Sequence, residues 1–576
     1  MAFTEKQLID IVKQVEDDMI APGGIFELHT ETVFGIPMKV FKHRQQNLRE
    51  ILLSSANHGN NTYIVCDGRR FSYAEHLQLV ATVAQNLQTK YKIQKGDRVA
   101  ILADNHPEWI ITFWATISLG AIAVGLNGWW TRREILYGLE LSEPKILIAD
   151  QKRYARIADD DIGIPIVIIE NNYAAELLEK TTDVLPTDDT LPTTDIQEDD
   201  PALILFTSGT TGHPKGAVIT HRSLVNFVTS AFFNGYRTMM VKEARKTQGE
   251  ALTEEAFTLP TGLYTAPLFH LSGLFAGALA SLAAGLKTVW CTGRFEPENI
   301  LSLIQNEKIS IWAALGSMAQ RLMDHPRFAD YDVSSITILG SGGAPTSRNL
   351  QDKMQEKFPG AKNSMAVGYG LTESTGAGTT NWNEFLTMYP DSCGRPFPGL
   401  EMAIHDVQGN SLPPNTQGEI CIRGACVMQE YWRNSQATAA AISQDRWLKT
   451  GDIGRINDDG FLFINTRARE LILRNAENIY PVEIEHCLER HPAVKEAAVG
   501  GVDHPVVGQE VKAIIVPKAG IQPPIENMQA FCQEFLAPFK VPTLWEIRAA
   551  PLPRNAAGKI LKNVLTGMAE HSLIEE

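Results

Sequence analysis

The chain alternates short apolar runs with amphipathic stretches, a pattern that predicts strands separated by helices. Buried strands are predicted by the apolar runs at residues 97–104, 144–150, 162–170 and 202–206. Residues 107–120, between the first two runs, have the length and apolar content of a helix. Strands that alternate with helices indicate parallel sheets arranged in layers, and therefore an α/β fold.

Other segments depart from this pattern. Residues 4–20 place apolar side chains at helical spacing and predict an amphipathic helix, whereas residues 21–45 predict irregular structure. Residues 182–200 are rich in Asp, Thr and Pro, which is typical of a surface linker. Residues 236–258 carry many charged and few apolar side chains, so we interpret them as a solvated insertion. Residues 271–286 are apolar but too short to span a bilayer and predict a buried helix.

A chain of 576 residues is too long for one hydrophobic core, so at least two domains are expected. Near residues 465–470 a β-rich stretch passes into a charged segment. Beyond it the pattern predicts a small α+β domain with helices and strands at residues 481–490, 497–502, 511–517 and 527–536. The predicted division is 1–466, with 1–45 as an N-terminal extension, followed by 467–576.

Composition narrows the class of partners. The net charge of −15 argues against a nucleic-acid partner but does not exclude a nucleotide, which needs only local positive charge. Seven dispersed cysteines indicate reduced thiols in the cytosol and no zinc site. The N-terminus lacks the basic start and apolar centre of a signal peptide, so a cytoplasmic protein is expected.

The chemistry is concentrated in residues 205–218, where an apolar strand leads into a loop of hydroxyl residues and glycines followed by a lysine. The loop residues are Thr207, Ser208, Gly209, Thr210, Thr211, Gly212 and Lys215. Glycines let backbone N–H groups approach an anion, hydroxyls add donors, and the lysine adds a point charge. The spacing excludes a P-loop, because Pro214 precedes the lysine and Gly216 follows it. A phosphate-binding loop is predicted over the alternative, an ordinary Ser/Thr/Gly turn.

This stretch closely resembles the signature of the adenylate-forming enzymes, which include acyl-CoA synthetases, coumarate–CoA ligases, beetle luciferases and the adenylation domains of nonribosomal peptide synthetases. Further motifs follow in the family's order over about residues 50–565. The resemblance implies a large N-terminal layered α/β domain and a small mobile C-terminal α+β domain. It also implies ATP, Mg²⁺ and CoA as cofactors and cosubstrates.

A second motif comprises Gly368, Tyr369, Gly370, Leu371, Thr372 and Glu373. In the resembling enzymes the threonine meets the phosphate, the tyrosine lies near the adenine, and the glutamate helps hold Mg²⁺. The resemblance therefore implies that Thr372 and Glu373 are catalytic and that Glu373 is the metal ligand. The alternative interpretation of this motif is an ordinary glycine turn followed by a glutamate on the surface.

Candidate binding residues also follow two other predicted strands, where the sequence patterns are less specific. Gly343, Ala344 and Pro345 follow an apolar strand, where small residues let an adenine and an acyl chain pass close to the backbone. His270 resembles the aromatic gate that lines the carboxylate site, and a purely structural histidine is the alternative.

The remaining motifs lie towards the C-terminus. Asp452, expected in a Gly-Asp turn at a strand end, is the candidate for binding both ribose hydroxyls. Arg467 matches the family's nucleotide-contacting arginine, beside the hinge at residues 467–469. Lys559 matches the catalytic lysine, which supplies charge to the α-phosphate and the departing pyrophosphate. Asn475 and Ala476 stand where the family often has glycines along the path of the CoA arm.

The predicted activity is that of an ATP-dependent acid–thiol ligase, which forms an acyl-AMP and transfers the acyl group to CoA. A fatty or other hydrophobic acid is favoured over an amino acid, because His270 is not followed by an aspartate and nearby segments contain Phe227, Phe232, Phe233, Trp312, Ala313 and Ala314. The alternatives are an acyl-AMP ligase that loads a carrier protein, an aryl- or steroid-acid CoA ligase, and a non-catalytic nucleotide-binding protein. Peripheral membrane contact and a homodimer are left open.

Overall fold

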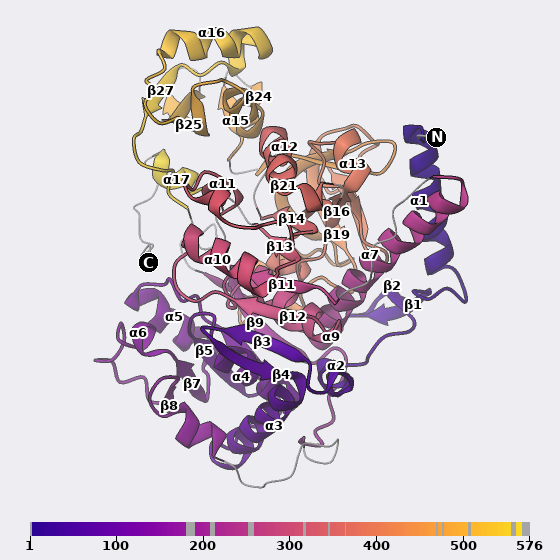
Figure 1. Ribbon diagram of the computed structural model, residues 1–576, viewed down its shortest axis with the longest axis vertical. Coiled ribbons are helices and arrows are strands. Elements are labelled where there is room, and N and C mark those ends of the chain that lie inside the picture. The colour runs from indigo at the N-terminus through magenta and orange to yellow at the C-terminus, as the bar shows by residue number, and fades with distance from the viewer. Residues whose placement is uncertain are drawn as a thin grey trace.

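The computed structural model describes residues 3–179, 191–207, 214–250, 259–314, 318–343, 346–362, 364–467, 470–474, 477–504, 508–554 and 560–566. These residues form two large sheets with their helices, a smaller sheet, and a separate α+β unit at the C-terminal end (Figure 1). The predicted α/β class is confirmed. None of the described helices has the length and apolar composition needed to cross a membrane.

The N-terminal extension is a helix followed by a hairpin. Helix α1 (Glu5–Ile20) begins at a capping box between Thr4 and Gln7 and buries Ile11, Val12, Val15 and Met19, as its periodicity predicts. The prediction of irregular structure over 21–45 is wrong, because β1 (Leu28–Val33) and β2 (Ile36–Phe41) pair in antiparallel register. Phe34 and Gly35 join them with φ of 49° and 84°. A tight turn with two positive φ values usually shows Asn-Gly or Asp-Gly, so Phe-Gly gave no turn signal.

The first large sheet is mostly parallel. Its strands are β5 (Arg98–Leu102), β6 (Ile122–Gly125), β7 (Ile146–Ala149), β8 (Ile166–Ile168), β9 (Pro201–Thr207), β10 (Lys215–Thr220) and β20 (Glu430–Tyr431), in the spatial order β20-β10-β9-β6-β5-β7-β8. Strands β5 to β9 run parallel, whereas β10 is antiparallel to β9 and β20 is antiparallel to β10. The four predicted strands are confirmed, and β6, β10 and β20 are additional ones.

Five helices accompany the strands in this part of the described chain. They are α2 (Leu48–Ser54), α3 (Tyr73–Thr89), α4 (Pro107–Ser118), α5 (Arg132–Ser142) and α6 (Gln151–Tyr154). Helix α4 confirms the helix predicted over 107–120, and the burial of all twelve of its residues explains its lack of a polar face. One core cluster joins Val99 of β5 to Tyr63 on the other large sheet through Trp109 and Trp114 of α4.

The second large sheet has nine strands, with several parallel neighbours at its centre. They are β3 (Thr62–Cys66), β4 (Arg69–Ser72), β11 (Thr261–Tyr264), β12 (Lys287–Trp290), β13 (Ile311–Ala313), β14 (Ile338–Gly342), β15 (Met365–Tyr369), β16 (Thr379–Trp382) and β17 (Arg395–Pro396). Their spatial order is β17-β16-β15-β14-β13-β11-β12-β3-β4.

The helices of this part are α7 (His221–Thr247), α8 (Leu271–Gly273), α9 (Ser281–Ala283), α10 (Pro297–Glu307), α11 (Met318–Met323), α12 (Arg348–Lys357) and α13 (Asn383–Met388). A π-helix (Leu274–Ala280) connects α8 and α9, so the predicted buried helix over 271–286 is confirmed. Most of residues 236–247 are exposed, as predicted for a solvated segment, but they continue α7 rather than form a separate insertion. Helix α7 buries Arg237 and Val241 and packs against α1 (Figure 1).

A four-stranded antiparallel sheet precedes the C-terminal domain. Its strands are β18 (Glu401–His405), β19 (Gly418–Arg423), β21 (Leu448–Ile456) and β22 (Leu462–Arg467), and helix α14 spans Ser435–Ala441. The expected position of Asp452 at a strand end is wrong, because β21 continues four residues beyond it. The pairing of β21 shifts register next to Asp452, between Ile453 and Gly454, and Gly451 has a φ of 72°. The turn-like Gly-Asp sequence therefore marks an irregularity within a strand.

The C-terminal unit has its own sheet and core. Its elements are β23 (Ile472–Arg474), β24 (Glu477–Ile479), α15 (Pro481–Glu489), β25 (Val494–His504), β26 (Gly508–Pro517), α16 (Ile525–Phe535), β27 (Leu544–Ile547) and α17 (Lys562–Leu565). Residues of α15, α16, β25 and β26 share one hydrophobic cluster, which is separate from the clusters of the large sheets. The predicted small α+β domain is confirmed as an architecture, and Figure 1 shows it at one end of the molecule.

Polar contacts join this domain to the rest of the chain. The Tyr480 hydroxyl donates to Gln417 Oε1 at 2.6 Å, and Lys495 Nζ lies 3.8 Å from Asp324 Oδ2. On α15, burial raises the pKa of Glu489 to about 7, with a further contribution from the nearby Glu485 carboxylate. A hydrogen bond with Ser347, the N-cap residue of α12, acts in the opposite direction.

Replacing Glu489 by glutamine should change how stability depends on pH. Because the carboxyl group titrates near 4.5 when exposed and near 7 when folded, ionisation destabilises the native protein progressively from pH 4.5 to 7. E489Q should remove this loss. Its free energy of unfolding should exceed that of wild type by up to about 3 kcal/mol above pH 7 and differ little from it below pH 4.5. Urea unfolding midpoints at pH 5 and pH 8 measure the effect. The exposed Glu534 on α16 provides the control E534Q, and equal pH slopes for both variants would contradict the assignment.

Candidate active site

Several of the predicted site residues in the described ranges follow parallel strands of one large sheet. Strands β11, β13, β14 and β15 run parallel, so the segments that follow them leave the same edge of their sheet. His270 follows β11, Gly343 follows β14, and Gly370 follows β15. Phe269, next to His270, lies beside Gly125 at the end of β6 in the other sheet. The two strand-end edges therefore face a common region.

The lysine of the phosphate-loop motif has no acidic partner in the part of the chain that the structure describes. Thr207 ends β9 and Lys215 begins β10, directly opposite it in the antiparallel register. Lys215 is half-buried, and its Nζ lies 5.0 Å from the centre of the Tyr431 ring. It forms no ion pair with any residue in the described ranges. A partly desolvated ammonium group that touches only an aromatic face is available to bind an anion.

The Gly-Tyr-Gly segment is held in a tight fold that only glycine permits. A Cβ on Gly370 would lie 2.2 Å from the carbonyl oxygen of Gly376, and one on Gly378 would lie 2.2 Å from that of Tyr369. Gly376 also has a φ of 71°. Gly368 pairs with Gly342 of β14, where a Cβ on Gly342 would approach the Gly368 oxygen to 2.9 Å. These glycines let the chain turn back at the strand end and present the next residues at the edge.

Thr372 and Glu373 form the 3₁₀ turn that follows. Thr372 is buried, and the backbone oxygen of Glu373 accepts a hydrogen bond from Met428 N at 2.8 Å. The Tyr431 hydroxyl donates to Glu373 Oε1, also at 2.8 Å. The other carboxylate oxygen has no hydrogen-bond partner among the described residues. Glu373 is therefore oriented by two contacts and keeps one oxygen available.

This carboxylate fits a magnesium site of the kind that nucleotides complete. No group of three or more His, Cys, Asp or Glu side chains in the described ranges is arranged to hold a metal ion. Mg²⁺ commonly binds through one or two carboxylates together with water and substrate phosphates. Glu373 near the unpaired Lys215 fits that pattern, whereas a metal cage built from protein ligands alone does not.

Two further residues that are candidates for nucleotide binding, 83 positions apart in the sequence, are in contact. The Tyr369 hydroxyl donates to Asp452 Oδ2 at 2.7 Å, and Asp452 is only 3% exposed. Arg467 of β22 lies opposite Asp452 of β21 in the antiparallel register. An aromatic ring whose hydroxyl is fixed to a carboxylate can place an adenine and a ribose side by side.

His270 has a defined local role that is compatible with a wall of the site. It caps the short helix α8, and its Nδ1 lies 2.9 Å from Ser272 Oγ. Burial lowers the pKa of His270 to about 4, so the ring is neutral at pH 7. A neutral ring with one nitrogen engaged can line a substrate pocket but supplies no positive charge.

The aromatic residues expected around the acid are divided between different regions. Phe227 lies 5.5 Å from Phe275, centre to centre, and both rings approach the backbone of Gly376. Phe233 instead packs against Phe26 in the core beneath α1, and Trp312 is fully buried against Phe358. Of these three residues, Phe227 is therefore the one that adjoins Gly376, just beyond the Gly-Tyr-Gly segment, whereas Phe233 and Trp312 belong to core clusters.

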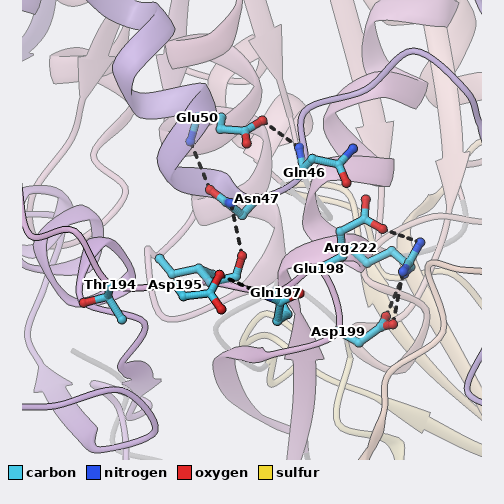
Figure 2. A pocket seen from close by; sticks show the side chains of 10 residues that line it. Gln46, Asn47, Glu50, Thr194, Asp195, Gln197, Glu198, Asp199 and Arg222 are labelled. Atoms are coloured by element: carbon cyan, nitrogen blue, oxygen red, sulfur yellow. Dashed lines mark hydrogen bonds and ion pairs between the residues drawn. The ribbon is translucent and has the colours of Figure 1, made fainter. Parts of the chain in front are cut away.

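The cavity shown in Figure 2, of about 510 Å³, lies away from these residues. Its walls include residues that immediately precede β9 and Arg222, which follows β10, whereas the phosphate motif joins the other ends of these strands. Arg222 is engaged with Asp199, Glu198 and Glu31, and Glu198 also pairs with Arg44. These ion pairs tie the N-terminal hairpin to the sheet and engage Arg222, so we assign no chemistry to the cavity.

Several predicted site residues lie outside the described residues. They are Ser208, Gly209, Thr210, Thr211, Gly212, Ala344, Pro345, Asn475, Ala476 and Lys559. Conversely, sequence reasoning missed Tyr431, which contacts both Lys215 and Glu373. Tyr431 lies in a two-residue edge strand, too short for its periodicity to suggest a role.

Comparison with known proteins identifies the family. Residues 53–432 match the AMP-binding enzymes, and residues 483–559 match the C-terminal domain of the same enzymes. The chain belongs to the family of AMP-binding enzymes. The resemblance to adenylate-forming enzymes stated from the motifs is thereby confirmed.

Among relatives of this AMP-binding enzyme, the long-chain-fatty-acid–CoA ligase of Bacillus subtilis strain 168 is 30% identical over 558 residues, covering 90% of this chain and 94% of the relative. 4-Coumarate–CoA ligase 3 of Arabidopsis thaliana is 30% identical over 506 residues, covering 86% of each chain. The structure of o-succinylbenzoate CoA synthetase from Bacillus subtilis, in complex with its acyl-adenylate intermediate, is similar with a TM-score of 0.73 and 28% identity, covering 91% of this chain and 98% of that one. The large and small domains predicted from the sequence are confirmed by this similarity.

Proposed function

We propose that this AMP-binding enzyme is an ATP-dependent acid–CoA ligase. The observation that carries the proposal is the half-buried Lys215, which has no ion pair among the described residues, beside the oriented Glu373, together with the hydrogen-bonded Tyr369–Asp452 pair. This arrangement supports separate sites for phosphates, metal and nucleoside. Relatives named as CoA ligases of fatty and aromatic acids support the same activity.

In the proposed first step, a substrate carboxylate oxygen attacks the α-phosphorus of ATP, and the bond to the bridging oxygen of pyrophosphate breaks. Both reactants are anions, so no residue has to transfer a proton, and catalysis depends on positioning and charge neutralisation. Lys215 and Thr372 would bind the phosphates, and Asp452 would hold the ribose. Glu373 would hold Mg²⁺, which when bound would supply positive charge to the phosphates.

In the proposed second step, the thiol of CoA attacks the carbonyl carbon of the acyl-AMP and AMP leaves. The domain boundary at residues 466 and 467 is part of the proposal, with rotation of the small domain withdrawing Lys559 and opening the CoA path. The family often has glycines at the positions of Asn475 and Ala476, which would lie along that path. CoA remains the proposed acceptor, because a loop can shift to admit a small side chain.

The proposed substrate is a hydrophobic acid, fatty in preference to aromatic. Phe227, Phe275 and Leu271 surround the backbone of Gly376 with apolar carbon, and no acidic side chain follows His270 to bind an α-amino group. Apolar surface of this kind favours an alkyl or aryl group over a charged one.

An ATP–pyrophosphate exchange assay over fatty, aryl, steroid-like and amino acids tests both the reaction and the substrate. The fastest exchange is expected with a fatty acid, and greater activity with a free amino acid would refute the hydrophobic pocket. Addition of CoA to the best acid should convert slow acyl-AMP formation into steady release of AMP and acyl-CoA. If acyl-AMP accumulates with CoA present and turns over only with a phosphopantetheine carrier protein, the enzyme is instead a carrier-loading ligase.

A further inference from the structure

Tyr431 contacts two groups of opposite charge that the proposed reaction uses. It lies on β20, opposite Ala217 of β10, so its side chain projects beside the start of β10 where Lys215 stands. The ring faces Lys215 Nζ at 5.0 Å, and the hydroxyl donates to Glu373 Oε1 at 2.8 Å. The ring of Tyr431 therefore faces the lysine that is proposed to bind phosphate, and its hydroxyl contacts the carboxylate that is proposed to hold the metal.

The tyrosine is held firmly. Its side chain is 7% exposed and packs with Val427, Met428 and Leu448. This packing fixes the ring and the hydroxyl in the positions from which they contact Lys215 and Glu373.

The contacts keep the two charges from neutralising each other. No ion pair joins Lys215 to Glu373 in the described part of the chain, although both touch this side chain. A direct ion pair would engage the ammonium group that phosphate needs and the carboxylate oxygen that the metal needs. With the ring between them, Lys215 and one oxygen of Glu373 both remain available.

We propose that Tyr431 is a positioning residue that holds Lys215 and Glu373 apart in the orientation that receives magnesium and the phosphates of ATP. This inference rests on the proposed function. It assigns Tyr431 no contact with substrate; the residue acts through the lysine and the glutamate. Partners of metal-binding groups typically change metal affinity or activity about 10- to 100-fold when they are removed.

The test is ATP binding by calorimetry, with and without Mg²⁺, for wild type and Tyr431→Phe. Phenylalanine keeps the ring over Lys215 and removes only the hydroxyl, so binding of metal-free ATP should be unchanged. The tightening of ATP binding by Mg²⁺ should fall about tenfold. Tyr431→Leu removes the ring as well and should also weaken binding of metal-free ATP. In exchange assays, Y431F should raise the Mg²⁺ requirement and leave the KM for the acid unchanged.

Tyr91→Phe is the matched control, because Tyr91 also donates its hydroxyl to a carboxylate, Glu176 Oε2, at 2.9 Å. It should bind Mg²⁺ and ATP as wild type does. In the background of Glu373→Gln, Tyr431→Phe should have no further effect on the Mg²⁺ dependence, since the tyrosine acts on the metal through that carboxylate.

The outcomes separate this inference from the proposed function. If the wild-type enzyme shows no Mg²⁺-dependent binding of ATP, the proposed function fails and the role of Tyr431 fails with it. If wild type binds Mg²⁺ and ATP but Y431F has the same Mg²⁺ dependence, only the positioning role is wrong. An equal loss of metal-free and Mg²⁺-dependent binding in Y431F would indicate a structural role and would also overturn the inference.

Discussion

Replacing Glu373 by glutamine should lower acyl-AMP formation by about 10²- to 10³-fold, the effect expected when one group that stabilises transition-state charge is lost. Glutamine has the same size, and its carbonyl oxygen can still accept the hydrogen bond that Tyr431 donates. The substitution therefore removes the negative charge and little else. ATP–pyrophosphate exchange measures the loss, and raising the Mg²⁺ concentration should restore part of the rate.

Glu430 provides the control for this experiment. It precedes Tyr431 on β20, and because side chains alternate along a strand it points to the other face. Glu430→Gln removes the same charge from a neighbouring position and should leave exchange close to wild type. If both variants lose the same amount, the effect of Glu373 is local destabilisation. If E373Q keeps the wild-type rate and Mg²⁺ requirement, Glu373 does not hold the metal.

Replacing Lys559 by alanine should lower acyl-AMP formation by about 10²-fold or more and spare transfer of the acyl group from supplied acyl-AMP to CoA. The reason is that its compact charge serves the α-phosphate and the leaving pyrophosphate, which take part in the first half-reaction alone. Arg554 and Ile560, on either side of the segment that carries Lys559, form an antiparallel bridge. Arg554 also pairs with Glu496 of β25 at 2.7 Å, which attaches this segment to the small domain.

The two half-reactions should be measured separately, by pyrophosphate exchange and by release of AMP from synthetic acyl-AMP with CoA. Lys518→Ala, at an exposed position just after β26 in the same domain, is the control for loss of a lysine. Equal losses in both half-reactions for K559A would show that the lysine supports the domain as a whole. That result would contradict a role confined to adenylation.

Local sequence patterns were sufficient to predict a helix or strand wherever the pattern lies within that one element. The periodicity of α1, the apolar length of α4 and the alternation of helices and strands beyond residue 470 each predicted the observed element. The hairpin of β1 and β2 could not be predicted in this way, because Phe34 occupies a turn position with positive φ that this residue type seldom adopts. Residues 236–247 look solvated in sequence, but the packing of α7 against α1 buries Arg237 and Val241 among them.

By itself, the sequence determined the α/β class, the two-domain organisation and the family, because these follow from periodicity and from motifs whose residues are neighbours in the chain. Only the tertiary structure decided which groups meet: Tyr369 with Asp452, and Tyr431 with both Lys215 and Glu373. These contacts arise from the pairing of β20 with β10 and from the parallel strands that end at one edge. Pairing between strands far apart in sequence depends on the whole sheet, so no local pattern of side chains could have indicated it.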